Sequence, residues 1–120
     1  MAKWIPDGWH SVTPRLVCEN PARLVQFLRE VFDASGELRE DRPSQMRVGD
    51  SMIMVSDTRA RRATSAFLYV YVEDADEVYR RSLQAGAVSL EKPEDTPYGD
   101  RRAMIRDPFG NDWQIATSKG

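Results

Sequence analysis

The chain has 120 residues, of which 41% are hydrophobic and 30% charged, a balance typical of one folded domain and not of a disordered segment. The net charge of −2 gives no indication of nucleic acid or an anionic membrane as a partner, and no apolar run approaches the roughly 20 residues that cross a bilayer. The N-terminal residues MAKWIPDGWH contain no apolar signal core, so we expect a cytoplasmic protein.

A strand and a helix open the chain. Residues 11–18, SVTPRLVC, are predicted to form a strand, with Pro14 near its entry because proline cannot donate to a β-ladder. The only cysteine, Cys18, can form no intrachain disulfide and is expected to be buried in this strand. Asn20 is expected to cap a helix over about 21–33 that has a proline at its first position. The spacing of Leu24, Phe27, Leu28 and Val31 gives this helix one apolar face.

Three short strands complete the first half of the chain. They are predicted at about 36–40, at about 44–48 and at 51–55, and Gly49-Asp50 forms the hairpin turn between the last two. The polar residues 56–64, SDTRARRAT, are interpreted as a linker.

The same order of elements then begins again. Residues 66–72, AFLYVYV, form a strand rich in aromatic and β-branched residues. Asp74 is expected to cap a helix over 75–85, and Gly86 ends it. Strands at about 87–90, 101–106 and 112–117 follow, joined by the loop EKPEDTPYGD and by the turn Asp107-Pro-Phe-Gly-Asn111.

The chain therefore carries a βαβββ order twice, over 11–55 and 66–117, within a single domain of residues 1–120. Each module has one apolar helix face and a half-covered sheet. We expect an α+β fold with the helices outside and a mostly antiparallel, concave sheet surface inside.

Four segments carry a family resemblance: WIPDGWHSVTPRLVCENPAR, YVYVEDADEV, PYGDRR and DPFGNDWQIAT. In this order and spacing, over residues 3–118, they resemble the glyoxalase/bleomycin-resistance/dioxygenase superfamily, also called the vicinal oxygen chelate fold, and in particular its phosphonate-operon-type branch. The resemblance implies the two-module fold, but it does not fix the chemistry because one fold hosts many functions.

Enzymes of this superfamily typically hold a divalent metal with His, Gln or Glu from both modules. The resemblance places the corresponding positions at Thr13, Tyr69 and Gln114, with a fourth on the 51–55 strand. A hydroxyl, a phenol and an amide are poor substitutes for the imidazole and carboxylate donors that such a metal needs. The only histidine, His10, lies three residues before Thr13 and so on the opposite strand face. We therefore expect neither a metal nor another cofactor.

If these positions point inward, strand alternation defines the two faces of the sheets. The predicted ligand-binding residues combine aromatic rings, methionines, arginines and an amide: Arg15, Met52, Met54, Phe67, Tyr69, Tyr71, Arg102, Met104 and Gln114. Aromatic faces stack on flat rings, methionine supplies adaptable apolar contact, and arginine pairs with a carboxylate or phenolate. This lining fits an aromatic small molecule. The same residues also fit a filled core or a dimer interface.

We therefore expect a metal-free binding protein, similar to the bleomycin-resistance members, that sequesters an aromatic antibiotic or secondary metabolite and breaks no bond. Relatives commonly share pockets across a dimer, so we expect a two-fold homodimer. Two alternatives stay open: a metal-dependent glyoxalase- or dioxygenase-type lyase or isomerase, and a non-catalytic regulatory domain with a filled cavity.

Overall fold

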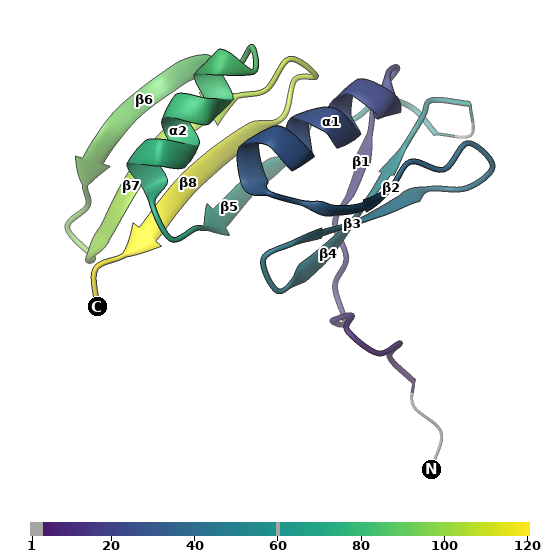
Figure 1. The fold of residues 1–120 in the computed structure, drawn as a ribbon, viewed down its shortest axis with the longest axis horizontal. Helices are drawn as coiled ribbons and strands as arrows, with labels where there is room; N and C mark the ends of the chain where they lie inside the picture. The colour runs from purple at the N-terminus through teal and green to yellow at the C-terminus, as the bar shows by residue number, and fades with distance from the viewer. Residues whose placement is uncertain (1–3, 60) are drawn as a thin grey trace. The chain divides into compact units, whose positions relative to one another are not determined.

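The structure, a computed structural model, describes residues 4–59 and 61–120, which divide into two compact units (Figure 1). The first unit comprises the residues up to Arg29 together with Asp33–Thr64, and the second comprises Glu30–Phe32 and Ser65–Gly120. Each unit contains one four-stranded sheet, and the elements follow the expected βαβββ order along the chain, so the prediction of a two-module α+β fold is confirmed.

The first unit contains a sheet of order β1-β4-β3-β2. Its strands are β1 (Arg15–Val17), β2 (Ser35–Glu37), β3 (Ser44–Val48) and β4 (Ser51–Ser56). β1 pairs in parallel with β4, and the two remaining pairings are antiparallel. On one face of this sheet the strands carry buried apolar side chains: Leu16, Met46, Val48, Ile53 and Val55. The other face of this sheet is half-buried or exposed.

Helix α1 (Pro21–Phe32) begins and ends close to where the sequence predicts. The side chain of Asn20 accepts a hydrogen bond from the backbone N–H of Arg23 at 3.3 Å, and the proline fills a position that needs no donor. The helix ends at Asp33, whose left-handed backbone lets its own N–H reach the carbonyl of Leu28. Its apolar face is buried as expected.

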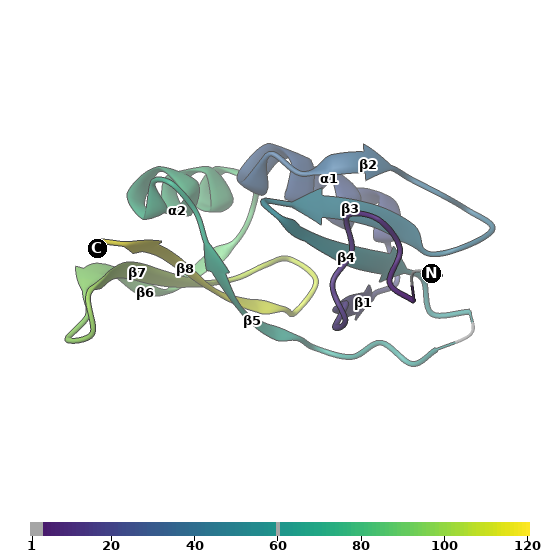
Figure 2. The same cartoon turned by 90° about the horizontal axis from the view of Figure 1, so that it is seen from below.

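The second unit repeats the arrangement with a sheet of order β5-β8-β7-β6 (Figure 2). Its elements are β5 (Phe67–Tyr71), α2 (Ala75–Gln84), β6 (Val88–Asp95), β7 (Asp100–Arg106) and β8 (Asp112–Ser118). β5 pairs in parallel with β8, and the pairs β8-β7 and β7-β6 are antiparallel.

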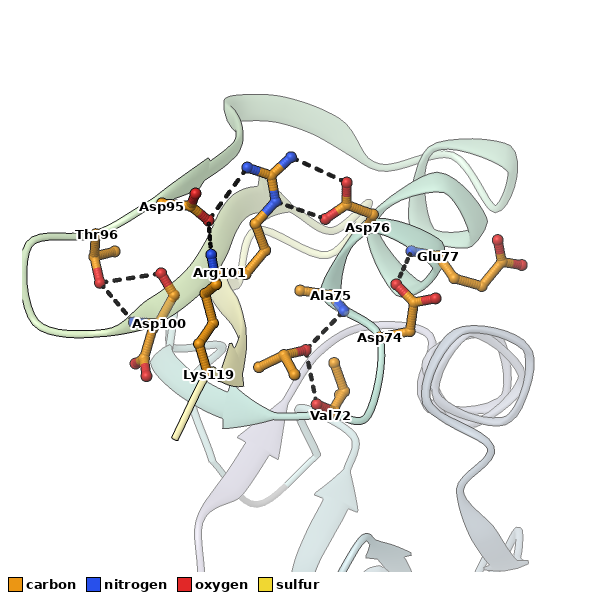
Figure 3. Close-up of polar contacts among 11 residues, drawn as sticks. Val72, Asp74, Ala75, Asp76, Glu77, Asp95, Thr96, Asp100, Arg101 and Lys119 are labelled. Carbon is orange, nitrogen blue, oxygen red and sulfur yellow. Dashed lines mark hydrogen bonds and ion pairs between the residues drawn. The ribbon is translucent and has the colours of Figure 1, made fainter.

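Helix α2 covers the apolar face of this second sheet. Its N-terminus is capped by Asp74, whose carboxylate accepts from the backbone N–H of Glu77 at 3.1 Å (Figure 3). The guanidinium of Arg101 on β7 bonds the carboxylate of Asp76 on α2 at 3.0 and 3.1 Å, which places the helix on the face to which Arg101 points. That parity also carries the buried side chains of Ala103, Ile105, Trp113 and Ile115.

Some strand predictions are wrong at their boundaries. β2 covers Ser35–Glu37, whereas the sequence predicts this strand at about 36–40. β1 begins at Arg15 and not at residue 11, because Pro14 has no N–H to donate. The carbonyl of Pro14 accepts a hydrogen bond from the N–H of Met54 at 2.9 Å, which is the first bond between β1 and β4. β6 runs through Asp95, although residues 91–95 were expected in a loop. Register shifts on either side of Glu91 show that bulges carry the polar, proline-containing stretch along an edge strand.

Neither helix among the described residues is long and apolar enough to cross a membrane.

Candidate functional site

The open face of the second sheet carries a row of aromatic side chains. Along β5, exposure alternates: Phe67, Tyr69 and Tyr71 are 65%, 39% and 60% exposed, while Leu68 and Val70 between them are half-buried. The buried face lies under α2, so the three rings stand on the opposite face. The rings of Tyr69 and Tyr71 lie 5.4 Å apart at 56°, which keeps an aromatic surface available to a third ring.

A buried carboxylate fixes the two tyrosines. Asp100 is 4% exposed, and its Oδ2 accepts from the phenol of Tyr69 at 2.6 Å and from that of Tyr71 at 2.9 Å. The turn before β7 holds Asp100 in place, because its N–H donates to Thr96 Oγ1 and its carbonyl accepts from the same hydroxyl (Figure 3). Loss of solvent around the phenol and the bond to Asp100 raise the pKa of Tyr69 above its ordinary value. Tyr69 is therefore a neutral donor in this site.

Arg102 provides the positive charge beside the tyrosines. Its Nη1 donates to the hydroxyl of Tyr98 at 2.8 Å, and its Nη2 lies 3.4 Å from Oε1 of Glu91. The arginine side chain is only 18% exposed, and its Nε is buried with no hydrogen-bond partner among the described residues. A buried guanidinium N–H without an acceptor is costly, and the contacts of Arg102 to Tyr98 and Glu91 are made by its two Nη groups.

The other predicted residues of this unit stand next to the row. Tyr69 pairs with Gln114 on β8, and Gln114 pairs with Met104 on β7, so the three side chains share one face in register. Gln114 and Met104 are half-buried. Six of the predicted ligand-binding residues therefore come together on a single surface: Phe67, Tyr69, Tyr71, Arg102, Met104 and Gln114.

The three remaining predicted residues belong to the first unit. Arg15 is exposed, donates from Nε to Ser56 Oγ at 2.9 Å, and lines a 290 Å³ pocket with charged side chains of the 39–42 and 57–59 segments. Met54 lines a different pocket of 430 Å³, and Met52 is half-buried on the same strand. The nine residues are thus described as two groups, one in each unit.

The donor set does not fit the divalent-metal site of the family. Tyr69 and Gln114 pair with each other, but the phenol donates a hydrogen bond to Asp100 and carries no charge. Thr13 contributes only a hydroxyl, and His10 is exposed with its Nε2 3.1 Å from the carbonyl of Asp50. Within residues 4–59 and 61–120, no group of three or more His, Cys, Asp or Glu side chains is placed to hold a metal ion.

Sequence reasoning missed three residues of this surface. Asp100 shares the parity of Arg102, but it was assigned to a loop because the strand was started one residue too late. Tyr98 and Glu91 fell in the same expected loop, and only the extended β6 brings Glu91 beside the arginine. If the predicted strand is extended back by one residue, from 101 to 100, alternation places the carboxylate of Asp100 on the same face as Arg102.

Comparison with known proteins defines the class. The sequence profile of the Glyoxalase/Bleomycin resistance protein/Dioxygenase superfamily matches residues 10–115, and the chain belongs to this superfamily. It is similar to an uncharacterised Mycobacterium tuberculosis protein, Rv0887c, with 26% identity over 123 residues, covering 88% of this chain and 72% of the relative.

Solved structures agree with this assignment. The chain is similar to TioX from Micromonospora sp. ML1, with 28% identity, a TM-score of 0.77, and coverage of 91% of this chain and 98% of TioX. It also shares the fold of the fosfomycin resistance protein FosX from Mesorhizobium loti, with 18% identity, a TM-score of 0.68, and coverage of 91% and 92% of the two chains.

Proposed function

We propose that this chain is a metal-free binding protein that sequesters an aromatic antibiotic or secondary metabolite without breaking a bond. The observation that carries the proposal is the row Phe67, Tyr69 and Tyr71 beside a mostly buried arginine, Arg102. We also propose that the chain belongs to the phosphonate-operon-type branch, because of the resemblance of its sequence segments to that branch.

The chemistry of the row selects a flat ligand with an anionic edge. Rings as exposed as Phe67 and Tyr71 gain contact area when a planar molecule stacks on them. Among the described residues, Arg102 donates a hydrogen bond to the phenol of Tyr98 and lies 3.4 Å from the carboxylate of Glu91, whose side chain is 44% exposed. A ligand carboxylate or phenolate would replace these contacts with a charge-assisted bond. We therefore expect an aromatic acid or a phenolic chromophore.

The superfamily supports the class of activity. The superfamily includes bleomycin resistance proteins, and one structural neighbour, FosX, is a fosfomycin resistance protein. FosX is 18% identical to this chain and supports only the fold. The preference for an aromatic ligand rests on the residues of the second unit.

Calorimetric titration tests the proposal. Indole-3-carboxylate serves as a minimal probe, followed by a panel of planar antibiotics that carry a carboxylate or phenolate. The best binder should lose about tenfold or more in affinity in Tyr69→Ala and in Arg102→Gln, because ring stacking and a charge-assisted bond are each worth about 1–3 kcal/mol.

Matched controls come from the opposite face of the same sheet. Arg101→Gln removes the same charge from the neighbouring position, where the guanidinium bonds Asp76. Tyr79→Phe removes a phenol that bonds Ser89 from α2. Both controls should bind like the wild type. If no compound binds below about 1 mM, or if the controls weaken binding as much as Tyr69→Ala does, sequestration at this surface is refuted.

A further inference from the structure

A second pocket lies beneath the N-terminal arm, residues 4–13, in the first unit. It has a volume of 430 Å³, within the range of small-molecule sites, and it is lined by Trp4, Trp9, Met54 and neighbouring residues. Trp4 is 83% exposed, which is unusual for the largest apolar side chain and calls for an explanation. The pocket shares no residue with the row on the second sheet.

Two hydrogen bonds tie the arm to β3 and to the turn that follows it. Arg47 on β3 donates to the carbonyl of Gly8 at 3.3 Å, and Nε2 of His10 donates to the carbonyl of Asp50 at 3.1 Å. The arm itself turns where the N–H of Trp9 donates to Pro6. Gly8 has a φ of 81°, which glycine adopts without strain at the third position of such a turn. These hydrogen bonds therefore anchor the arm at Gly8 and His10, and residues of the arm form one side of the pocket.

The lining chemistry defines the ligand. Indole faces and a methionine form the apolar walls, while Gln45, His10 and Thr13 supply hydrogen-bonding groups around them. No carboxylate, lysine or arginine stands among the residues that line this pocket in the described chain. A charged ligand would lose its hydration here without gaining a partner, whereas a neutral one loses little.

We propose that this pocket binds a neutral, flat aromatic or heteroaromatic molecule, stacked on the indoles and hydrogen-bonded at its edge by Gln45. The site uses residues of the first unit alone, so it does not depend on the proposed function of the second unit. Its chemistry is complementary to that of the Arg102 surface, which selects an anion.

The test uses the full chain labelled with ¹⁵N and the matched probes indole-3-carboxamide and indole-3-carboxylate. The chain has three tryptophans, so three indole N–H signals report binding. Phenylalanine variants of Trp4 and Trp9 assign two of them. The indole N–H of Trp113 is buried and donates to Asp107 at 2.9 Å, so its signal is an internal reference for a folded chain.

We expect the carboxamide to shift the Trp4 and Trp9 signals with one dissociation constant below about 1 mM, while the Trp113 signal stays in place. Trp9→Ala and Gln45→Ala should each weaken this binding about fivefold to tenfold or more. Gln45 is exposed on β3, so Gln45→Ala leaves the core untouched and keeps the test valid if loss of Trp9 releases the arm.

Three outcomes overturn the inference: signals of Trp4 and Trp9 that do not move, affinity that is unchanged in both variants, or tighter binding of the carboxylate at this site. Arg102→Gln serves as the control, because it should weaken carboxylate binding at the second unit about tenfold or more and leave carboxamide binding intact. Absence of carboxylate binding refutes the proposed function only together with failure of the whole antibiotic panel, whereas absence of carboxamide binding alone refutes this site.

Discussion

At the scale of single residues, one carboxylate organises the last turn. Asp107 is 3% exposed and accepts four hydrogen bonds: from the N–H groups of Phe109 and Asn111, from the amide of Asn111, and from the indole of Trp113, at 2.8 to 3.0 Å. These bonds build the turn that the sequence predicts between Asp107 and Asn111. The sequence shows the turn type, but it does not show that an indole from the next strand joins the same carboxylate.

Replacing Asp107 should therefore destabilise the chain strongly. Asp107→Ala leaves buried donors without acceptors and is expected to lower the free energy of unfolding by about 3 kcal/mol or more. Asp112→Ala is the control, because its ion pair with Arg106, whose side chain is 53% exposed, lies near the surface and is worth about 1 kcal/mol. Urea denaturation measures both, and equal losses in the two variants would contradict the account.

The Asp100 cluster predicts an alkaline limit to stability. The pKa of Tyr69 is raised by loss of solvent and by its bond to Asp100, and that of Tyr71 is raised first by the same carboxylate. The folded chain thus holds these protons above pH 10, where the unfolded chain releases them. Stability from these groups is complete below about pH 10 and falls as the pH rises further. Denaturation between about pH 8 and 11 should show this fall, shallower in Tyr69→Phe and unchanged in Tyr79→Phe.

The superfamily's metal position gives a third prediction at this scale. Protein purified without chelator should contain far less than one nickel, zinc, iron or manganese ion per chain, because Tyr69 is a neutral donor and Gln114 a single amide. Elemental analysis checks this directly. Close to one ion per chain that disappears in Gln114→Ala would show that the donor set does bind metal.

At the scale of elements, the helices were predictable because their signals are local. Asn20, Asp74 and the 3.6-residue apolar spacing place both helices to within about one residue. The full length of β6 was not predictable from the sequence. Its bulges depend on pairing with β7, which lies beyond the turn at Tyr98 and Gly99. The polar, proline-containing sequence of its second half indicates a loop unless that partner is known.

The cap of α2 can be tested separately from its packing. Asp74→Ala removes the acceptor for the N–H of Glu77 and should lower the free energy of unfolding by about 1 kcal/mol. Glu73→Ala, at the exposed neighbouring position, should change it by less than about 0.5 kcal/mol. Thermal unfolding measured by circular dichroism compares them, and a neutral Asp74→Ala would mean that the hydroxyl of Thr117, which accepts from Ala75, suffices to start the helix.

At the scale of the whole molecule, alternation in the sequence separated the polar-aromatic face from the apolar face in both sheets, because period-two geometry needs no tertiary information. It did not reveal the arm pocket. Trp4 and Trp9 lie outside any strand, and long-range contacts such as those of Arg47 and His10 tie their segment to the first unit. Residues without periodicity are placed by such contacts, which a single sequence does not specify.

The remaining prediction concerns assembly. β5 lies at the edge of its sheet and carries Phe67 and Tyr71, both more than half exposed. Proteins rarely leave an apolar edge strand uncovered. A second copy related by two-fold symmetry would cover the β5 edges of both copies at once. We expect sedimentation equilibrium to give twice the 13.7 kDa chain mass at micromolar concentration. Phe67→Lys should shift the chain toward the monomer, whereas Leu83→Lys, which adds the same charge to the exposed side of α2, should not. A wild-type chain that sediments as a monomer even at about 0.1 mM, some hundredfold above a typical micromolar dissociation constant, would show that the edge is covered by ligand or solvent and that each binding surface acts alone.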